Sequence, residues 1–189
     1  MTKAIDARTA LLALALGLGS LASLTTAAPA AKASAAATPA PAPTGAPASL
    51  PDLSLPDLEG KSHASKEWQD KVVLLDFWAT WCTGCRETIP VLIRLQEKFG
   101  AKGLAVTGIS VDKEGPKEKI AKFVRKQKMS YPILWDAGDT MSKLFGFEGI
   151  PSVFVYGRDG HLLKALPAYT AAQEKDLEAV VEAQFQGKP

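Results

Sequence analysis

A short apolar segment leads almost directly into the only two cysteines of this 189-residue chain, and this feature constrains the fold most. Residues 72–77 are mostly β-branched or aliphatic, which is typical of a central strand covered on both faces. Cys82 and Cys85 follow, with two residues between them. A helix that begins at Cys82 brings both sulfurs to one turn, where a disulfide can open and close without moving the fold. The pattern therefore predicts a redox-active dithiol.

The two cysteines have different predicted roles. Free N–H groups and the positive end of the helix dipole favour a thiolate at Cys82, which we expect to be the exposed nucleophile. Cys85, one turn further along, would resolve the mixed disulfide. Two other interpretations stay open. One is a static structural disulfide, which would close too short a loop to stabilise the chain much. The other is half of a zinc site with His63 and His161, whose spacing is not that of metal ligands.

One carboxylate interrupts the apolar segment. Burying Asp76 inside a central strand is costly, so its presence requires an explanation. It is either a solvated aspartate facing an edge of the sheet or a buried acid with a raised pKa. A buried acid there would take or give a proton as Cys85 attacks or leaves. We favour the buried acid and predict proton transfer by Asp76.

Three motifs resemble those of a known family. Residues 76–86 resemble the active-site stretch of thioredoxin-fold proteins, and in particular of the TlpA/ResA-like extracytoplasmic thiol-disulfide oxidoreductases. Residues 149–155 are similar to the cis-proline segment of that family, and Pro90 matches its helix-kinking proline. The resemblance implies that a cis Pro151 faces the dithiol and that Ile150 offers backbone hydrogen bonds to an extended substrate.

The active-site stretch also departs from the family pattern. TlpA-like proteins often carry two prolines between the cysteines and asparagine at the buried position, whereas this chain has Thr83, Gly84 and Asp76. The intervening dipeptide affects which redox form is favoured, so the direction of electron flow stays open. The acid at position 76 is closer to thioredoxin itself and favours a reductant. We further expect Trp81 to line the substrate surface.

The first part of the chain predicts a targeting signal and a linker rather than a folded domain. Residues 1–28 have the layout of a secretory signal peptide, with Lys3 and Arg8 before an apolar stretch at 10–24, and the cut site is not fixed by the sequence. An uncleaved N-terminal anchor is the alternative. Residues 29–48 are rich in alanine and proline, which predicts a disordered linker. We therefore expect an exported protein of the bacterial periplasm or extracytoplasmic space, either free or tethered to the membrane.

Residues 49–189 are predicted to form one α/β domain with a thioredoxin fold. It would contain a central mixed sheet flanked by helices, an N-terminal β-hairpin and a TlpA-type helix-strand insertion. The folded part carries 19 basic and 19 acidic side chains, a balance that suggests neither a nucleic acid nor an anionic membrane as partner. The expected strands lie at 53–58, 72–77, 104–111, 131–135, 152–156 and 161–166, with residues 66–69 completing the N-terminal element. The expected helices lie at 82–99, 117–128, 140–145 and 171–185.

The helix predicted at 117–128 carries six basic residues around an apolar side. This basic face either docks an acidic partner or is simply solvated, and we favour the solvated surface. Arg86, in the first turns of the preceding helix, either stabilises a thiolate or points to solvent. Neither residue set changes the main prediction.

The sequence thus predicts a monomeric thiol-disulfide oxidoreductase that needs no bound cofactor. The resemblance implies a membrane-embedded thiol donor and exported substrates with disulfides, such as cytochrome c precursors. Three alternatives remain. A disulfide-forming oxidant would use the same residues. A thiol peroxidase, suggested by the insertion, needs a Thr-x-x-Cys environment that residues 80–82 do not provide. A non-enzymatic copper-binding module would use the paired thiolates as soft ligands.

Overall fold

A five-stranded mixed sheet organises the computed structural model, which describes residues 45–113 and 117–186. Its strand order is β5-β4-β3-β6-β7, so the segment before the cysteines forms the central strand. Strands β3, β4 and β5 run parallel, whereas β6 is antiparallel to β3 and β7 is antiparallel to β6. The strands are β3 (Val72–Trp78), β4 (Leu104–Ser110), β5 (Ile133–Trp135), β6 (Ser152–Tyr156) and β7 (Leu162–Leu166).

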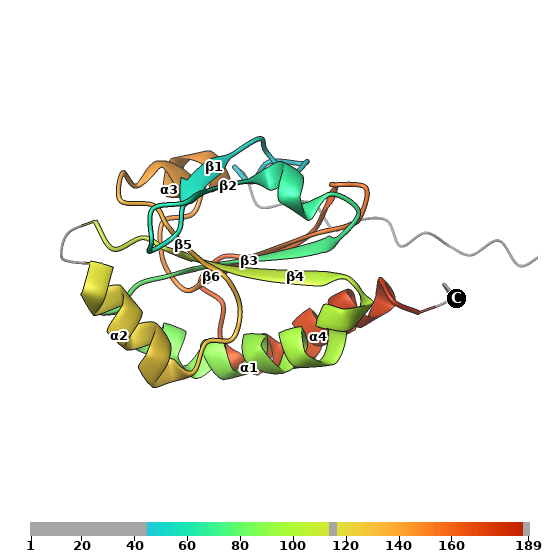
Figure 1. Ribbon diagram of the computed structural model, residues 1–189. Helices are drawn as coiled ribbons and strands as arrows, with labels where there is room; N and C mark the ends of the chain where they lie inside the picture. Colours follow the sequence, from blue (N-terminus) through green and yellow to red (C-terminus); the bar gives the residue numbers. More distant parts are fainter. Residues whose placement is uncertain (1–44, 114–116, 187–189) are drawn as a thin grey trace, which may run out of the picture. The chain divides into compact units, whose positions relative to one another are not determined.

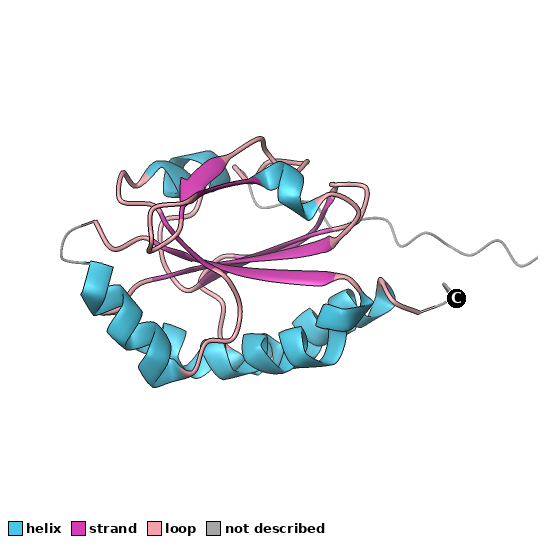
Figure 2. Cartoon of the chain, in the orientation of Figure 1, coloured by secondary structure: helices cyan, strands magenta, loops and turns pink. Residues whose placement is uncertain are grey.

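Helices cover both faces of this sheet (Figure 1 and Figure 2). One face is covered by α1 (Thr83–Phe99), α2 (Lys117–Gln127) and α4 (Glu174–Ala183). The other face carries α3 (Thr140–Phe145) together with a small hairpin of β1 (Ser54–Pro56) and β2 (Ser62–Ala64). This layered arrangement confirms the predicted α/β class and the mixed sheet.

Every residue of β3 is buried, and successive side chains project to opposite faces. Phe77 packs among aromatic rings on the α3 side, with 5.0 Å between its ring centroid and that of Phe145. Trp78 points the other way and stacks on Phe123 of α2, at a centroid distance of 5.0 Å. Asp76 lies two residues before Trp78 and therefore shares its face, which is the face covered by α1 and α2. Asp76 therefore lies on the same face of the sheet as α1, the helix that carries the cysteines.

Most predicted elements are confirmed to within two residues, but the N-terminal hairpin was placed wrongly. Its second strand is β2, whose His63 pairs with Leu55, rather than residues 66–69. Gly60 adopts a left-handed backbone with φ of 92°, which reverses the chain at residue 60. The second strand of the hairpin therefore begins at Ser62, four residues earlier than predicted. Ser65–Trp68 then forms a short 3-10 helix that buries Trp68.

Strand β5 is shorter than predicted, and the difference matters for the site. We expected a strand from residue 131, but pairing with β4 begins at Ile133. Pro132 has no backbone N–H to donate to a ladder, which favours a strand that starts after it. Its carbonyl instead accepts a hydrogen bond from the Gly108 N–H at 2.9 Å. Tyr131 consequently lies just before the strand and is buried.

The signal peptide interpretation and most of the predicted linker, at 1–44, lie outside the described residues. Residues 45–48, which the composition places in the linker, contact the domain. The Tyr156 hydroxyl donates to the Pro47 carbonyl at 3.2 Å, and the Leu162 N–H donates to the Ala48 carbonyl at 2.9 Å. Within 45–113 and 117–186, no helix combines the length and apolar character needed to cross a membrane.

Candidate active site

The two cysteines form a disulfide at the start of α1, with 5.4 Å between their Cα atoms. Cys82 is the N-cap residue, and its sulfur accepts a hydrogen bond from the Cys85 N–H at 3.1 Å. In this oxidised state Cys82 is 5% exposed, which is less than we expected for a nucleophile at an open helix end, while Cys85 is fully buried. Cys82 is therefore the more accessible of two largely covered sulfurs.

The histidines of the zinc interpretation lie elsewhere. The ring nitrogens of His63 contact carboxylate oxygens of Asp57 at 2.9 Å and of Glu67 at 3.0 Å. His161 is exposed and forms an isolated β-bridge with Ser49. Within the described part of the chain, no three His, Cys, Asp or Glu residues are grouped so that they could hold a metal ion.

A buried carboxylate fixes the loop that precedes Cys82. Asp112 accepts hydrogen bonds from the Thr80 N–H at 2.9 Å, from the Thr80 hydroxyl at 2.7 Å and from the Ser110 hydroxyl at 2.8 Å. Our sequence reasoning missed Asp112. The available signal was its position at the end of a strand parallel to β3, since the carboxyl ends of parallel strands meet at one edge of a sheet.

The two tryptophans of this segment differ in exposure, and Arg86 contacts the loop before Cys82. Trp81 is 65% exposed beside the disulfide, whereas Trp78 is fully buried in the core. The Arg86 guanidinium donates to the Thr80 carbonyl at 3.3 Å and lies 5.8 Å from the centre of the Phe123 ring. Arg86 thus helps to hold the loop rather than simply extending into solvent.

The proline segment lies against the dithiol turn. The Ile150–Pro151 peptide bond is cis. A Cβ atom at Gly84, between the two cysteines, would be 3.4 Å from Cδ of Pro151, so these two residues are in close contact. The Pro151 carbonyl accepts a hydrogen bond from the Tyr169 N–H at 2.8 Å, while Ile150 is partly exposed. The structure therefore brings Pro151 next to the cysteines, although 66 residues separate it from Cys85.

Asp76 is fully buried in the centre of the sheet. Its neighbours in the ladder are Gly108 on β4 and Val153 on β6. Its Oδ2 accepts one long hydrogen bond, 3.4 Å from the Tyr131 hydroxyl, while Oδ1 has no partner among the described residues. Burial raises the pKa of Asp76 to about 7, because the charged form loses its hydration, and the Tyr131 hydrogen bond opposes this rise. The solvated interpretation is wrong: Asp76 is a buried acid that titrates near neutrality.

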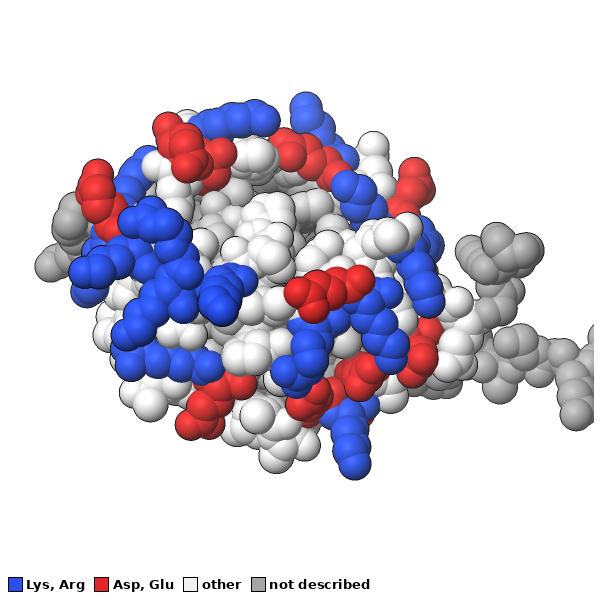
Figure 3. Space-filling view, turned by 60° about the horizontal axis from the view of Figure 1, so that its bottom comes forward, with Lys and Arg blue, Asp and Glu red and all other residues white. Residues whose placement is uncertain are grey.

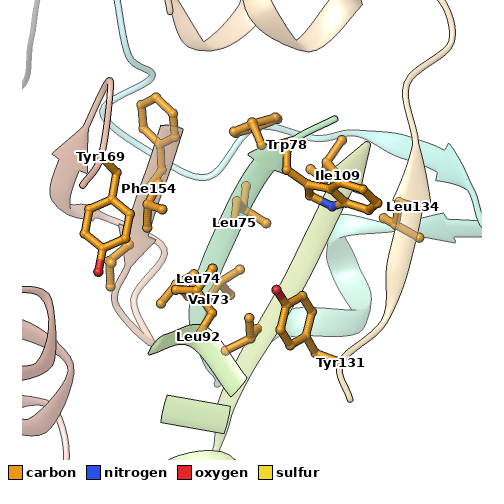
Figure 4. Close-up of a cluster of buried hydrophobic side chains, with 14 of the residues drawn as sticks. Val73, Leu74, Leu75, Trp78, Leu92, Ile109, Tyr131, Leu134, Phe154 and Tyr169 are labelled. Carbon is orange, nitrogen blue, oxygen red and sulfur yellow. The ribbon is translucent and has the colours of Figure 1, made fainter. Parts of the chain in front are cut away.

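Tyr131 was not identified from the sequence. Figure 4 shows its hydroxyl turned toward the central strands, on the side of the sheet where Trp78 lies. No local pattern marks it, because an aromatic residue before a short strand is an ordinary core residue. Its significance depends on contact with an acid 55 residues earlier in the chain.

Charge is distributed unevenly over the surface. Figure 3 shows Lys and Arg side chains gathered on the side where α2 lies, whereas acidic and basic groups alternate over α1 and α4. Part of this alternation consists of ion pairs between these two helices, including Lys98 with Glu178 at 2.7 Å. The exposed basic residues of the α2 region are Lys119, Lys122, Arg125, Lys126 and Lys128. They are consistent with the solvated face that we favoured.

The fold and the site together define a class. A disulfide at the start of a helix, directly after the central strand of a mixed sheet and against a cis-proline, is the arrangement of thioredoxin-type thiol-disulfide oxidoreductases. The profile described as the AhpC/TSA family matches residues 47–165, and the chain belongs to this family.

Named relatives support the same class. The chain is 29% identical over 119 residues to the thiol-disulfide oxidoreductase ResA of Geobacillus thermodenitrificans, a match that covers 63% of this chain and 67% of the relative. A candidate thiol:disulfide interchange protein DsbE from Chlorobium tepidum has a similar structure, with a TM-score of 0.67, 28% identity, and coverage of 72% of this chain and 95% of that one. A candidate protein disulfide isomerase from Bacteroides thetaiotaomicron gives a TM-score of 0.65, 26% identity, and coverage of 76% and 90%. This chain is a thiol-disulfide oxidoreductase of thioredoxin type.

Proposed function

We propose that this chain is an extracytoplasmic reductant of protein disulfides, in which Cys82 is the nucleophile, Cys85 resolves and Asp76 transfers the proton. The observation that carries the proposal is the buried Asp76 carboxyl, whose pKa of about 7 lets it both bind and release a proton at neutral pH. An acid of ordinary pKa would remain ionised there and would accept the Cys85 proton poorly. The dithiol carries both electrons, so no further cofactor is required.

The reaction proceeds in two exchanges. The Cys82 thiolate attacks one sulfur of the substrate disulfide, a mixed disulfide forms, and the first substrate thiolate leaves and takes up a proton. Asp76 then accepts the Cys85 proton, and the Cys85 thiolate attacks the Cys82 sulfur. The bond between Cys82 and the substrate breaks, the second substrate sulfur leaves as a thiolate and takes the proton from Asp76, and the protein keeps the disulfide. The substrate has gained two electrons from the dithiol and two protons, one from solvent and one from Cys85 through Asp76.

The surfaces beside the disulfide have complementary proposed roles. Trp81 offers an exposed apolar contact to the substrate. Ile150 lies at the cis-proline and is partly exposed, which suits backbone pairing with an extended substrate segment. We assign both residues to substrate binding, with Pro151 shaping the segment.

We place this activity outside the cytoplasm on the basis of the N-terminal signal or anchor pattern. The substrates would be exported proteins with disulfides, including cytochrome c precursors in cytochrome c biogenesis. A membrane-embedded thiol donor would restore the dithiol after each turnover. The protein would act as a monomer.

Trapping tests the nucleophile and the substrates together. Replacing the resolving residue, Cys85→Ser, should leave Cys82 joined to its substrates as mixed disulfides that resist dilution but release on addition of a reductant. Exported cysteine proteins should be recovered from the expressing bacterium. The matched control Cys82→Ser should trap nothing. Equal trapping by both variants would refute the assigned roles.

A redox titration against glutathione tests the direction. A reductant should have a potential near that of thioredoxin, about −270 mV, whereas a strong disulfide donor lies near about −120 mV. A reduction potential close to that of a strong disulfide donor would overturn the proposal in favour of an oxidant.

A thiol peroxidase is the second candidate, because the structure contains the helix-strand insertion, α2 and β5, that suggested it. A peroxidase reaction needs only one sulfur in its first step, so rapid peroxide consumption that survives Cys85→Ser would favour this candidate. We expect instead that peroxide turnover is slow in both the wild type and Cys85→Ser. Only the wild type, with both cysteines, should reduce protein disulfides.

A further inference from the structure

The hydrogen bond between Tyr131 and Asp76 joins two buried groups from distant parts of the chain. Tyr131 is 4% exposed and Asp76 is fully buried, with 3.4 Å between the phenol oxygen and Oδ2 of the carboxyl. Burial raises the pKa of Tyr131, so the hydroxyl stays protonated and always acts as the donor. The carboxyl therefore has one oxygen held by a permanent donor and one, Oδ1, left without a partner among the described residues.

Gly108 makes room for this arrangement. It pairs directly with Asp76 in the β3–β4 ladder and with Ile133 in the β4–β5 ladder. A Cβ atom at Gly108 would be 3.1 Å from the Tyr131 ring and 2.9 Å from Nε1 of Trp78, closer than ordinary contacts allow. The glycine thus leaves a flat surface beside the acid, on which the phenol ring lies. Any larger residue would displace the phenol, the indole or the side chain of Ile133, whose Cδ1 would lie 2.9 Å from that Cβ atom.

A neutral donor suits an acid that must exchange its proton. A lysine or arginine beside Asp76 would hold its carboxylate ionised and its pKa low, whereas a phenol stabilises the carboxylate only in part. In the oxidised protein, the ionisable groups of the described residues that interact with Asp76 are Tyr131 and, more weakly, Tyr169 from the segment after β7. Asp76 also lies on the face of the sheet that α1, the helix with Cys85, covers. No ion pair to Asp76 exists in the described part of the chain.

We propose that Tyr131 is a positioning residue for thiol exchange: its hydroxyl, seated over Gly108, holds Oδ2 of Asp76 so that Oδ1 is presented for proton exchange with Cys85. This inference rests on the proposed function, because it refines how the acid of that mechanism is held. Removing the hydroxyl removes the one stabilising contact of the carboxylate. The proton affinity of Asp76 should then increase.

The first measurement is the titration of the Asp76 carboxyl carbon by NMR in the oxidised protein. Tyr131→Phe keeps the ring and deletes the hydroxyl, and it should raise the pKa of Asp76 by about one unit, which corresponds to the loss of one ordinary hydrogen bond. Tyr156→Phe is the matched control. Its buried hydroxyl donates to the Pro47 carbonyl and has no contact with Asp76, so the titration should not move. An unchanged titration in Tyr131→Phe would overturn the proposal.

The second measurement is the pH dependence of single-turnover disulfide reduction. The rise in rate with pH that reports ionisation of Asp76 should move to higher pH by the same amount, about one unit, in Tyr131→Phe. Tyr156→Phe should keep the wild-type profile. A mere loss of stability would lower the rate without moving the profile, so a structural role alone would not reproduce the shift.

Asp76→Asn separates this inference from the proposed function. If Asp76→Asn abolishes the rise with pH but Tyr131→Phe leaves both the profile and the titration unchanged, only the role of Tyr131 is wrong. If Asp76→Asn leaves the profile unchanged, the proton-transfer role of Asp76 is wrong and the inference fails with it. Should Tyr131→Phe fail to fold, fluorotyrosine in place of tyrosine tests the same contact, because it keeps the ring and makes the hydroxyl a stronger hydrogen-bond donor to Asp76. The pKa of Asp76 should then fall, and an unchanged titration would overturn the proposal.

Discussion

Two buried carboxylates lie near the active-site turn, and they differ in how their oxygens are satisfied. Asp112, which follows β4, accepts three hydrogen bonds of 2.7 to 2.9 Å from Thr80 and Ser110. Asp76, inside β3, accepts one hydrogen bond of 3.4 Å from Tyr131. Both are at most 3% exposed, so burial alone does not distinguish them. The difference shows that the same residue type serves two purposes in one small region.

The number of hydrogen-bond donors to each carboxylate explains the difference between Asp112 and Asp76. Hydrogen bonds to a carboxylate replace its lost hydration and tie it to the groups that donate them. Asp112 therefore fixes the backbone before Cys82, which is the nucleophile of the proposed mechanism. Asp76 lacks such compensation, so its proton is held more tightly than in water and is exchanged near neutral pH. In the proposed mechanism, structural rigidity and proton transfer are thus divided between two buried acids.

The largest expected effect is a gain in stability on replacing Asp76. The folded pKa of about 7 exceeds the ordinary value of 3.8, so the folded protein binds the proton more tightly than the unfolded chain does. The contribution of Asp76 to stability is therefore greatest below pH 3.8 and falls as the pH rises to about 7. Asp76→Asn removes this penalty and should stabilise the oxidised protein by up to about 4 kcal/mol above neutral pH. Denaturant unfolding at several pH values measures the effect.

The difference between Asp76→Asn and the wild type should shrink toward zero near the ordinary pKa of the acid. A variant that is less stable than the wild type at high pH would show that Asp76 is compensated after all. In that case the contrast between the two acids would not hold.

Asp112 should behave in the opposite way. Asp112→Ala leaves the Thr80 N–H and two buried hydroxyls without their acceptor, and the expected loss of stability is about 3 kcal/mol. Because the loop before Cys82 loses its anchor, attack on a disulfide should also slow. Chemical unfolding and alkylation of reduced Cys82 measure these effects. The exposed variant Glu97→Ala serves as control and should change stability by less than about 0.5 kcal/mol.

A smaller effect is expected from one hydroxyl. Thr80→Val keeps the shape and the N–H bond to Asp112 but deletes the hydroxyl bond, which should reduce stability by about 1 kcal/mol. Thr80→Ser restores the hydroxyl and should recover most of that loss. Equal stability of the valine and serine variants would mean that the backbone contact alone anchors the loop.

The smallest effect concerns carboxylates at the surface. Hydrogen bonds with Glu67 and Asp57 raise the pKa of His63 above its usual 6.5, and those bonds lower the pKa of both acids. The histidine contribution is full below pH 6.5 and is lost as the pH rises through its folded pKa. The acid contributions are full above the usual values of 3.8 and 4.5 and are lost as the pH falls. His63→Ala should therefore reduce stability most between about pH 4.5 and pH 6.5.

Unfolding of the wild type and His63→Ala across this pH range measures the effect. A maximum difference above neutral pH would contradict the assignment. The comparison sharpens the contrast with Asp76, because His63 stabilises the charged forms of Asp57 and Glu67, whereas the charged form of the buried acid loses its hydration.

Local patterns predicted most of the elements but not all of their boundaries. Amphipathic periodicity identified α1, α2 and α4, because a helix that covers a sheet must be apolar along one side. The same reasoning placed the second strand of the hairpin wrongly. The position of this strand depends on where Gly60 reverses the chain and on what Trp68 packs against. A local sequence pattern specifies neither.

The sequence by itself determined that a strand delivers a cysteine pair to the start of a helix, because apolar runs, helix periodicity and the CxxC spacing act over short distances. It also singled out Asp76, since a charge inside an apolar run is conspicuous. Only the tertiary structure decided what that acid touches. Tyr131 and Asp112 lie 55 and 32 residues from the groups they bind, and the order and register of the parallel strands bring them there. Contacts of this kind depend on how the layers of the fold pack, which no local pattern records.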